Sequence, residues 1–411
     1  MKRYIYLVGK SDPYSESIQA IRRLGYSVGI FQDNRLTLKY PESYDNVIPI
    51  DFSKLDEEIM RLAIDELAID GLLCTYENYI IAKCKLATYL SVSSSSIESA
   101  EMATDKYLMR QAFLRADSTI TPRFAAISSQ VDLLEFAATA TYPLIIKPTN
   151  LVKSLLVMCC NNQEELLENF TYAEVTIKEL YRKYNIYDHK PRLIVEEFIT
   201  GKSCSVAAFV DHEGVVHFCE GIVSLTTAQE HGAADTYLYS RQLPLEVNDT
   251  LSKKIFAVSE RGVKALAMRS TPAHIELMYD GDDVKIIEIG ARIGGYRPRM
   301  YKFSYGMNLI DQAVKLALMQ QPDLSGSFKA YSAVFELLPE TEGAFVTINT
   351  SDVMTDKFTY FKVQPKQGQL VGPAKNGHKA TATIIIVEED KDKFNTLCRQ
   401  VDRMRVEVTK L

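Results

Sequence analysis

The chain has 411 residues, which is too long for one compact core and favours two or three domains. A hydrophobic fraction of 46% and a charged fraction of 24% are typical of a globular protein, and no apolar run is long enough to span a membrane. The net charge of −6 gives no general electrostatic reason to bind nucleic acid.

The cysteines and the first residues indicate a cytoplasmic protein. The seven cysteines are odd in number and include no CxxC pair, so neither a disulfide framework nor a zinc site is indicated. Met1, Lys2 and Arg3 lead directly into a strand-like YIYLVG, whereas a signal peptide would continue with a long apolar core.

Residues 1–95 alternate between expected strands and helices, which predicts a parallel sheet covered on both faces. The turn after the first strand, at residues 9–12, lacks the GxGxxG pattern of dinucleotide-binding domains. We therefore predict a Rossmann-like domain with a structural or substrate-contacting role. The expected strands are 4–8, 27–31 and 71–75, and the expected helices are 15–24, 51–69 and one that ends at residue 90.

A helix is expected to begin near residue 104. Thr104 is a suitable N-cap, and Asp105 would favour the positive end of the helix dipole. Lys106 then lies in the first turn, where an isolated lysine is most often a solvated surface residue.

A second lysine ends an apolar strand. The strand runs over residues 144–147, and its last residue, Lys147, places a charge where apolar side chains are the rule. Residues 148–154 are expected to form a hairpin loop before a returning strand at 155–160. A helix over residues 163–184 follows.

The next strand ends in a segment suited to holding a purine ring. The apolar residues 193–195 run into Glu196 and Glu197, and then into Phe198 and Ile199. Backbone groups of such an exit segment can read an adenine edge, while Phe198 and Ile199 supply apolar walls.

Two more strands are expected over residues 204–226, followed by a polar, irregular stretch at 227–243. A long loop of this kind is a candidate lid or substrate-recognition segment, and within it His231 and Asp235 are candidate selectors of the amine or side chain. An ordinary solvated loop is the alternative. A helix over residues 248–268 leads out of it.

A β-hairpin is predicted where the apolar runs 275–279 and 284–289 flank an Asp-Gly-Asp-Asp segment. If residues 281–283 form the loop, Glu276 lies opposite Glu288 on the same face. Directly opposed carboxylates repel, so this register requires a cation between them or a proton on one, and Mg²⁺ fits because it prefers oxygen ligands. The alternative is that both glutamates only face solvent.

The chain after Glu288 is rich in glycine and arginine. A metal held by carboxylates next to guanidinium groups is suited to moving a phosphoryl group from a nucleotide. Arg297 and Arg299 would orient substrate, or would only pair with surface acids. The residues in this stretch are Gly290, Arg292, Gly294, Gly295, Arg297 and Arg299.

Residues 330–411 are strand-rich and predict a small α+β C-terminal subdomain. The strand-like runs are GAFVTI, FTYFKV and ATATIIIVE, and a helix is expected over residues 391–404. A helix over residues 309–320 precedes this segment.

In their order and spacing, these stretches resemble the ATP-grasp superfamily of ATP-dependent carboxylate-amine ligases, and the EIGARIGG form looks most like the branch of bacterial L-amino acid ligases. The resemblance covers the whole chain as an ATP-grasp fold, of mixed α/β and α+β class. The matching pieces are Thr104–Lys106 with Met109 and Arg110, Leu144–Pro148, Val195–Ile199 with Gly201, Ile275–Leu277, and Glu288–Arg292 with Gly294 and Gly295.

The resemblance implies a domain order and a set of site residues. A Rossmann-like domain at 1–95 would precede a small lobe with its linker helix at 96–200, a large lobe with the metal site at 201–329, and the C-terminal subdomain at 330–411. The implied roles are phosphate binding by Lys106 and Lys147, adenine recognition by Glu196 and the backbone of Glu197 and Ile199, two Mg²⁺ ions on Glu276 and Glu288, and substrate carboxylate binding by Arg292.

Three positions depart from the family pattern. The loop at 149–154 lacks the usual glycines, so Lys153 and Ser154 are expected to supply phosphate donors instead. Ser203 stands where the family often has a glutamate for the ribose, and Gly290 stands where it has a metal-binding asparagine.

The predicted activity is an ADP-forming ligation of a small-molecule carboxylate to an amine. Both substrates are predicted to be amino acids, and the predicted cofactors are ATP and Mg²⁺, with Mn²⁺ as a substitute. A purine-pathway or carboxylase-type ligase is the alternative among enzymes, and a non-catalytic nucleotide-binding regulator is the alternative from another class. No nucleic acid or membrane partner is expected, and a homodimer is left open.

Overall fold

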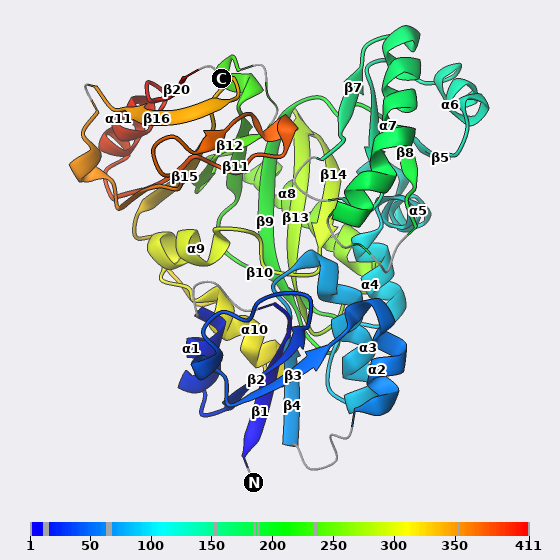
Figure 1. Ribbon diagram of the computed structural model, residues 1–411, viewed down its shortest axis with the longest axis vertical. Coiled ribbons are helices and arrows are strands. Elements are labelled where there is room, and N and C mark those ends of the chain that lie inside the picture. The colour runs from blue at the N-terminus through cyan, green and yellow to red at the C-terminus, as the bar shows by residue number, and fades with distance from the viewer. Residues whose placement is uncertain are drawn as a thin grey trace.

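The computed structural model describes residues 2–10, 16–62, 68–151, 155–183, 186, 190–233, 235, 237–351 and 353–409. Figure 1 shows the N-terminal domain at the bottom, the small lobe with its long helix at the upper right, and a large central sheet that continues into the C-terminal segment at the upper left. None of the helices in these ranges is both long and apolar enough to cross a membrane.

The N-terminal domain contains a parallel sheet, as predicted, and its strand order is β3-β2-β1-β4. The helix expected over 51–69 is shorter, because β4 already begins at Ala68. Strand β3 was missed, since it is only five residues long and contains Pro49, which does not favour a strand. The elements are β1 (Arg3–Gly9), α1 (Glu16–Arg23), β2 (Ser27–Asp33), β3 (Asn46–Ile50), α2 (Leu55–Arg61), β4 (Ala68–Leu73) and α3 (Ile80–Leu90).

Two helices link this domain to the small lobe, α4 (Ile97–Thr104) and α5 (Lys106–Ala116). The predicted cap is wrong by one residue: Asp105 is the N-cap of α5, and its carboxylate accepts hydrogen bonds from the backbone N–H groups of Tyr107 and Leu108. The Thr104 hydroxyl instead donates back to the carbonyl of Ala100 within α4. Lys106 is therefore the first residue of α5.

The small lobe is a four-stranded antiparallel sheet with order β5-β8-β6-β7. The returning strand expected over 155–160 is only three residues long. A buried apolar cluster joins α7 to this sheet. The elements are β5 (Phe124–Ile127), α6 (Gln130–Ala137), β6 (Leu144–Pro148), β7 (Met158–Cys160), α7 (Gln163–Lys183) and β8 (Leu193–Glu197).

The large lobe is built on a nine-stranded sheet with order β14-β13-β9-β11-β12-β15-β19-β17, with β10 paired to β9. Residues 204–226 contain parts of three strands, one more than predicted, and β12 occupies part of the expected loop 227–243. The elements are β9 (Lys202–Val210), β10 (Val216–Phe218), β11 (Val223–Thr227), β12 (Leu238–Leu243), α8 (Asp249–Ala265), β13 (Thr271–Asp280), β14 (Asp283–Gly290), α9 (Arg297–Tyr305) and α10 (Leu309–Ala317).

The C-terminal segment extends the large sheet across the predicted boundary at residue 330, because β12 pairs with β15 and β15 pairs with β19. A second, three-stranded sheet of order β18-β16-β20 lies beside it. The elements are β15 (Tyr331–Leu337), β16 (Gly343–Asn349), β17 (Tyr360–Val363), β18 (Leu370–Val371), β19 (Ala382–Glu388), α11 (Lys391–Val401) and β20 (Arg405–Thr409).

The N-terminal domain shares an apolar core with the large lobe. Ile5 and Ile30 of the N-terminal sheet belong to the same buried cluster as Phe209 of β9 and Tyr301 of α9. At Gly71 of β4, an added Cβ would lie 2.8 Å from the carbonyl oxygen of Ala317 in α10. This close approach packs the N-terminal sheet against α10.

Candidate active site

The predicted hairpin is formed by β13 and β14, and Glu276 lies opposite Glu288, as the sequence predicts. The predicted turn is wrong: Asp280 pairs with Asp283, so only two residues form the turn. A β-bulge farther along restores the expected pairing, because Leu277 pairs with Ile286 and Glu276 with Glu288, which leaves Ile287 as the extra residue.

The bulge places Glu288 on the ligand side of the sheet. In β14 the side chains of Val284 and Ile286 are buried, and regular alternation would bury Glu288 with them. The extra residue reverses the alternation, so Ile289 enters the core and the Glu288 side chain is 34% exposed. The same bulge leaves the carbonyl of Ile287 free to accept from Arg110 Nη2 at 2.7 Å.

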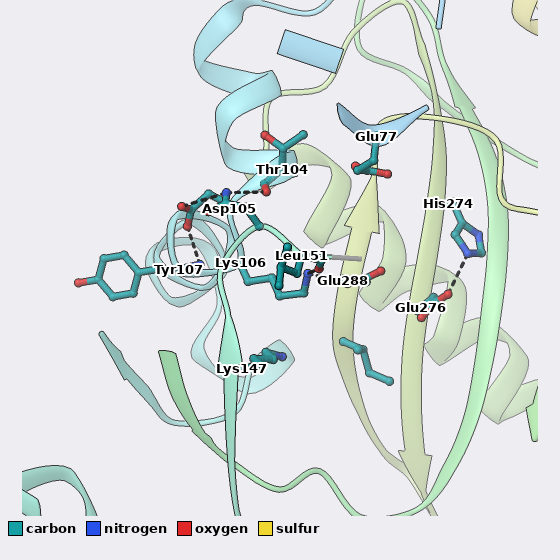
Figure 2. A network of polar contacts seen from close by, with 12 residues as sticks. Glu77, Thr104, Asp105, Lys106, Tyr107, Lys147, Leu151, His274, Glu276 and Glu288 are labelled. Carbon is teal, nitrogen blue, oxygen red and sulfur yellow. Dashed lines mark hydrogen bonds and ion pairs between the residues drawn. The ribbon is translucent and has the colours of Figure 1, made fainter. Parts of the chain in front are cut away.

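His274 holds the other metal-site candidate in place. Its Nε2 lies 3.0 Å from Oε1 of Glu276 (Figure 2). Burial lowers the pKa of His274, so the imidazole is neutral and Nε2 is the donor. Burial would raise the pKa of Glu276, but the bond from His274 and the charges of Arg297 and Arg292 hold that pKa well below its ordinary range. Glu276 is therefore ionised.

Lys106 reaches across from α5 to the hairpin (Figure 2). Its Nζ lies 3.3 Å from Oε2 of Glu288 and donates to the carbonyl of Leu151 at 3.0 Å. With a side chain only 14% exposed, it is not the solvated surface lysine that its sequence position alone suggests. It connects Leu151, in the predicted phosphate loop, to Glu288, a predicted metal ligand.

Lys147 belongs to a buried chain of charges in the small lobe. Its Nζ lies 2.6 Å from Oε2 of Glu196, and Arg110 Nε lies 2.8 Å from Oε1 of the same carboxylate. Burial lowers the pKa of Lys147 to about 8, although Glu196 opposes this. Burial would raise the pKa of Glu196, but Arg110 and Lys147 lower it to about 2. Glu196 is thus an anion that orients Lys147.

The segment after Glu196 has the form expected of an adenine site. The Glu197 carboxylate accepts from Arg123 Nη1 at 3.2 Å and from the backbone N–H of Thr141 at 3.2 Å. Phe198 is 42% exposed, which is high for a phenylalanine and suits a side chain that stacks on a ligand. Ile199 follows it directly and is half-buried. The adenine roles of Glu196, Glu197, Phe198 and Ile199 remain predictions.

Arg292 forms an ion pair with a residue of the N-terminal domain. Its Nε lies 2.5 Å from Oε2 of Glu77, which follows β4, and its Nη1 donates to the carbonyl of Ile293. Burial would lower the pKa of Arg292, but Glu77 and then Glu288 raise it. An Arg292 side chain that is 21% exposed can still receive a ligand carboxylate.

The surroundings of the glycines after Glu288 differ. At Gly290 an added Cβ would lie 3.2 Å from Oε2 of Glu77, so a side chain there would require this carboxylate to shift slightly. Gly294 is more tightly constrained, because an added Cβ would lie 2.6 Å from Nδ1 of His274. Gly295 has open space around it.

Arg297 is an interior residue. It is 2% exposed, and its Nη2 donates to the Ser205 hydroxyl at 2.8 Å. Burial and the charge of Arg241 lower its pKa to about 10. Its predicted substrate role would therefore be indirect. Arg299 lies closer to the surface, with Nε 3.7 Å from Oε1 of Glu16.

The two candidates from the expected lid lie elsewhere. His231 packs against the ring of Tyr239, and Asp235 accepts from the backbone N–H of Lys375. Both lie in the connection between β11 and β12 and contact the C-terminal segment, His231 at Asp402 and Asp235 at Lys375. Their role in substrate selection remains a prediction.

The carboxylates of Glu276 and Glu288 offer the hard oxygen donors that Mg²⁺ prefers. Within the described residues, no group of three or more His, Cys, Asp or Glu side chains forms a complete metal site. Water and nucleotide phosphates would have to complete the coordination shell. Lys153 and Ser154, the predicted phosphate donors, lie outside the described residues.

Sequence reasoning missed Glu77 and gave no role to Arg110. The sequence places Arg110 four residues after Lys106, on the same face of the helix. It does not show the partners of Arg110, because these lie on β8 and β14. Glu77 gave no local signal, because its partner lies in another domain.

Comparison with known sequences identifies the central part of the chain. The sequence profile described as an ATP-grasp domain matches residues 140–298. Alanine–anticapsin ligase from Bacillus subtilis is 25% identical over 253 residues, which cover 58% of this chain and 52% of that protein. The match thus spans about half the length of that relative.

Solved structures share the complete fold. L-amino acid ligase from Bacillus licheniformis has a TM-score of 0.83 at 19% identity, and the alignment covers 100% of this chain and 99% of that one. Phosphoribosylglycinamide synthetase from Anaerococcus prevotii has a TM-score of 0.70 at 19% identity, with 100% of both chains covered. Residues 140–298 thus match an ATP-grasp domain, and the full-length likeness shows that the chain has the ATP-grasp fold, as its sequence predicts.

Proposed function

We propose that the protein is an ADP-forming ligase that joins the carboxylate of one small molecule to the amine of another, and that both are amino acids. The observation that carries the proposal is the convergence of Lys106 on Glu288, which sets a phosphate-binding cation against the glutamate pair. The free thiols of all seven cysteines fit a reducing, cytoplasmic setting.

The chain's own residues would act mainly by positioning and charge neutralisation. Lys106 and Lys147 would bind the phosphates of ATP, and Arg292 would hold the carboxylate of the first substrate. A carboxylate oxygen attacks the γ-phosphorus, and the bond to the β,γ-bridging oxygen breaks to release ADP. The amine of the second substrate then attacks the acyl carbon, loses a proton, and expels phosphate.

Mg²⁺ bound by Glu276 and Glu288 would neutralise the charge on the transferring phosphate. Glu196 keeps Lys147 directed toward the phosphates, because its two oxygens are held by Arg110 and Lys147 itself. His274 keeps Glu276 ionised and oriented.

The comparisons favour amino acids over purine-pathway substrates. The structure of the L-amino acid ligase is more similar in fold, at a TM-score of 0.83, than that of phosphoribosylglycinamide synthetase, at 0.70. The anticapsin ligases also join an amino acid, according to their name, and match more than half of this chain.

The proposal is tested by incubating the protein with ATP, Mg²⁺ and pooled amino acids, and recording nucleotides and condensed products by mass spectrometry. We expect ADP and a dipeptide. AMP in place of ADP would overturn the acyl phosphate route, and bound but unconsumed ATP with every substrate would favour the non-catalytic regulator.

A matched pair of variants tests whether this activity depends on the hairpin carboxylates. Glu288→Gln should lower ADP release by at least about 100-fold with the fold retained, because it removes the charge that the metal site needs. Asp283→Asn makes the same change on the same strand, at a side chain that is 62% exposed, and should have no effect. Equal rates in both variants would contradict the metal assignment.

A further inference from the structure

Lys106 supplies a positive charge directly beside the pair of facing glutamates. Its Nζ lies 3.3 Å from Oε2 of Glu288 (Figure 2). Glu276, on the facing strand, accepts a hydrogen bond from His274 instead. We propose that Lys106 is an internal counter-ion that competes with the divalent cation for Glu288, so that the metal binds tightly only when nucleotide phosphates draw Lys106 away. This inference rests on the metal site of the proposed function.

Within the described residues, the neighbouring cations are engaged with other carboxylates. Arg292 Nε lies 2.5 Å from Oε2 of Glu77. Lys147 Nζ lies 2.6 Å from a carboxylate oxygen of the small lobe. The ion pair that Glu288 forms in this part of the chain is with Lys106. The lysine therefore holds the position next to Glu288 that a metal ion would need.

Lys106 and a metal ion would compete for the same oxygen atom. Mg²⁺ binds carboxylate oxygens at about 2.1 Å, so an ion on Oε2 of Glu288 would lie within about 5.5 Å of Lys106 Nζ as it stands. The two side chains are 14% and 34% exposed, so solvent screens this region only in part. A divalent cation and an ammonium repel each other strongly at such a distance. Tight metal binding thus requires Lys106 to move.

The other contacts of Lys106 place it where phosphates are expected to enter. Its Nζ donates to the carbonyl of Leu151 at 3.0 Å, and its backbone N–H donates to the carbonyl of Thr149 at 2.8 Å. Both acceptors belong to the predicted phosphate loop. Lysine carries its charge on a flexible four-carbon stem, so the ammonium can turn from Glu288 to a phosphate oxygen while the helix stays in place.

Nucleotide phosphates favour this exchange, because a diphosphate or triphosphate carries more negative charge than one carboxylate and attracts the ammonium more strongly. Once Lys106 neutralises a phosphate, Glu288 is free to bind the metal. Until then, the lysine reduces the repulsion between two facing carboxylates and limits the binding of stray divalent ions. The metal is therefore expected to bind after the nucleotide or together with it.

The test measures metal binding in the absence of nucleotide, so its readout does not depend on activity. Mn²⁺ is the probe, and the electron paramagnetic resonance signal of free Mn²⁺ gives the Kd. Lys106→Gln removes the charge but keeps a donor for the Leu151 carbonyl. It should lower the Kd for Mn²⁺ roughly tenfold relative to the wild-type protein, the scale of one partly screened charge contact. Lys106→Met, which lacks the donor, should give a similar gain.

Lys285→Gln is the matched control. Lys285 lies on the same hairpin and pairs with Asp283 at its turn, so its loss should leave the Kd for Mn²⁺ unchanged. A double variant shows where the metal binds: when Glu288→Gln is added to Lys106→Gln, the gain should disappear, because the oxygen for which lysine and metal compete has lost its charge.

A Kd for Mn²⁺ that does not fall in Lys106→Gln would overturn this inference alone, and so would a gain confined to Lys106→Met, since that gain would come from the lost loop contact. A gain that persists in the double variant would place the metal elsewhere and would overturn the metal assignment as well. If the wild-type protein releases no ADP with any substrate pair, the proposed ligase activity is wrong, but the expected Kd values would still support the competition at Glu288.

Discussion

At the scale of single residues, the fold changes the pKa of Lys147. Burial lowers this pKa from 10.5 to about 8, even though the nearby Glu196 carboxylate raises it. A cation that binds phosphate only while protonated makes nucleotide affinity depend on pH in the mildly alkaline range.

We predict that the affinity for ADP is nearly constant below pH 7.5 and weakens as the pH rises through about 8, because free Lys147 then loses its proton. The limiting loss is about tenfold per pH unit for one proton. Isothermal titration from pH 7 to 9.5 measures this directly, since the phosphates of ADP are already ionised there.

Lys147→Arg provides the control, because a guanidinium stays charged throughout this range. Its affinity for ADP should be lower at neutral pH, since the larger head fits poorly against Glu196, but it should not fall further as the pH rises. A wild-type affinity that is flat up to pH 9.5 would remove Lys147 from the phosphate site.

At the scale of elements, the bulge in β14 joins the two lobes. It turns Glu288 toward Glu276 and releases the Ile287 carbonyl, which accepts from Arg110. Arg110 in turn holds Glu196, and Glu196 holds Lys147. One extra residue therefore connects the hairpin carboxylates to Lys147, the predicted phosphate ligand.

Deletion of Ile287 tests this connection. The pairs on both sides of the bulge would keep their registers, so Glu276 and Glu288 should remain opposite each other and the hairpin should form. Arg110 would lose an acceptor in a buried position, at a cost of about 1–3 kcal/mol in the free energy of unfolding. Urea unfolding and ADP release measure the two effects.

We expect this deletion to lower both stability and activity while the chain still folds. A variant that cannot fold would show that the bulge sets the register, and one that behaves like wild type would show that the Arg110 contact has no consequence.

The hairpin also shows which features of the site sequence patterns predict and which they do not. The opposition of Glu276 and Glu288 was predictable, because two apolar runs and a turn define it within a few residues. The bulge was not predictable, because a three-residue turn without a bulge gives the same pairing of Glu276 with Glu288. What decides between them is the burial of Ile286 and Ile289 on one core face, and that core is supplied by α8 and α5.

Contacts between segments far apart in the sequence were even harder to predict. Strands of the N-terminal sheet follow from alternating apolar runs, and Lys147 stands out because it ends one. By contrast, Glu77 contacts Arg292 only because two domains pack against each other. The polar stretch around His231 also gave no sign that it contacts the C-terminal segment. Local patterns specify elements, but the packing of elements specifies the rest of the site.

At the scale of the whole molecule, the docking of the N-terminal sheet on α10 positions Glu77. Gly71 permits this docking, because an added Cβ would lie 2.8 Å from the Ala317 carbonyl oxygen and 3.0 Å from its Cβ. Backbone atoms cannot yield to such a contact without a shift of the helix.

Gly71→Ala should therefore destabilise the protein by about 1–3 kcal/mol, as overpacking does in well-filled interiors. It should also reduce ADP release beyond what the loss of folded protein explains, since a displaced N-terminal domain would draw Glu77 away from Arg292. Equilibrium unfolding in urea and activity of the folded fraction would separate these effects. Unchanged values would mean that the interface adapts freely.

The pairing of β12 with β15 has a practical consequence for shortened forms of the protein. A fragment that ends before Tyr331 would lack the strand that covers β12, and the hydrogen-bonding groups of that strand would face solvent. Uncovered strand edges recruit other chains, so such a fragment should self-associate. Anyone trimming this protein for crystallisation or fusion therefore has to preserve the C-terminal segment, even though the predicted metal ligands lie at the other edge of the sheet, on β13 and β14.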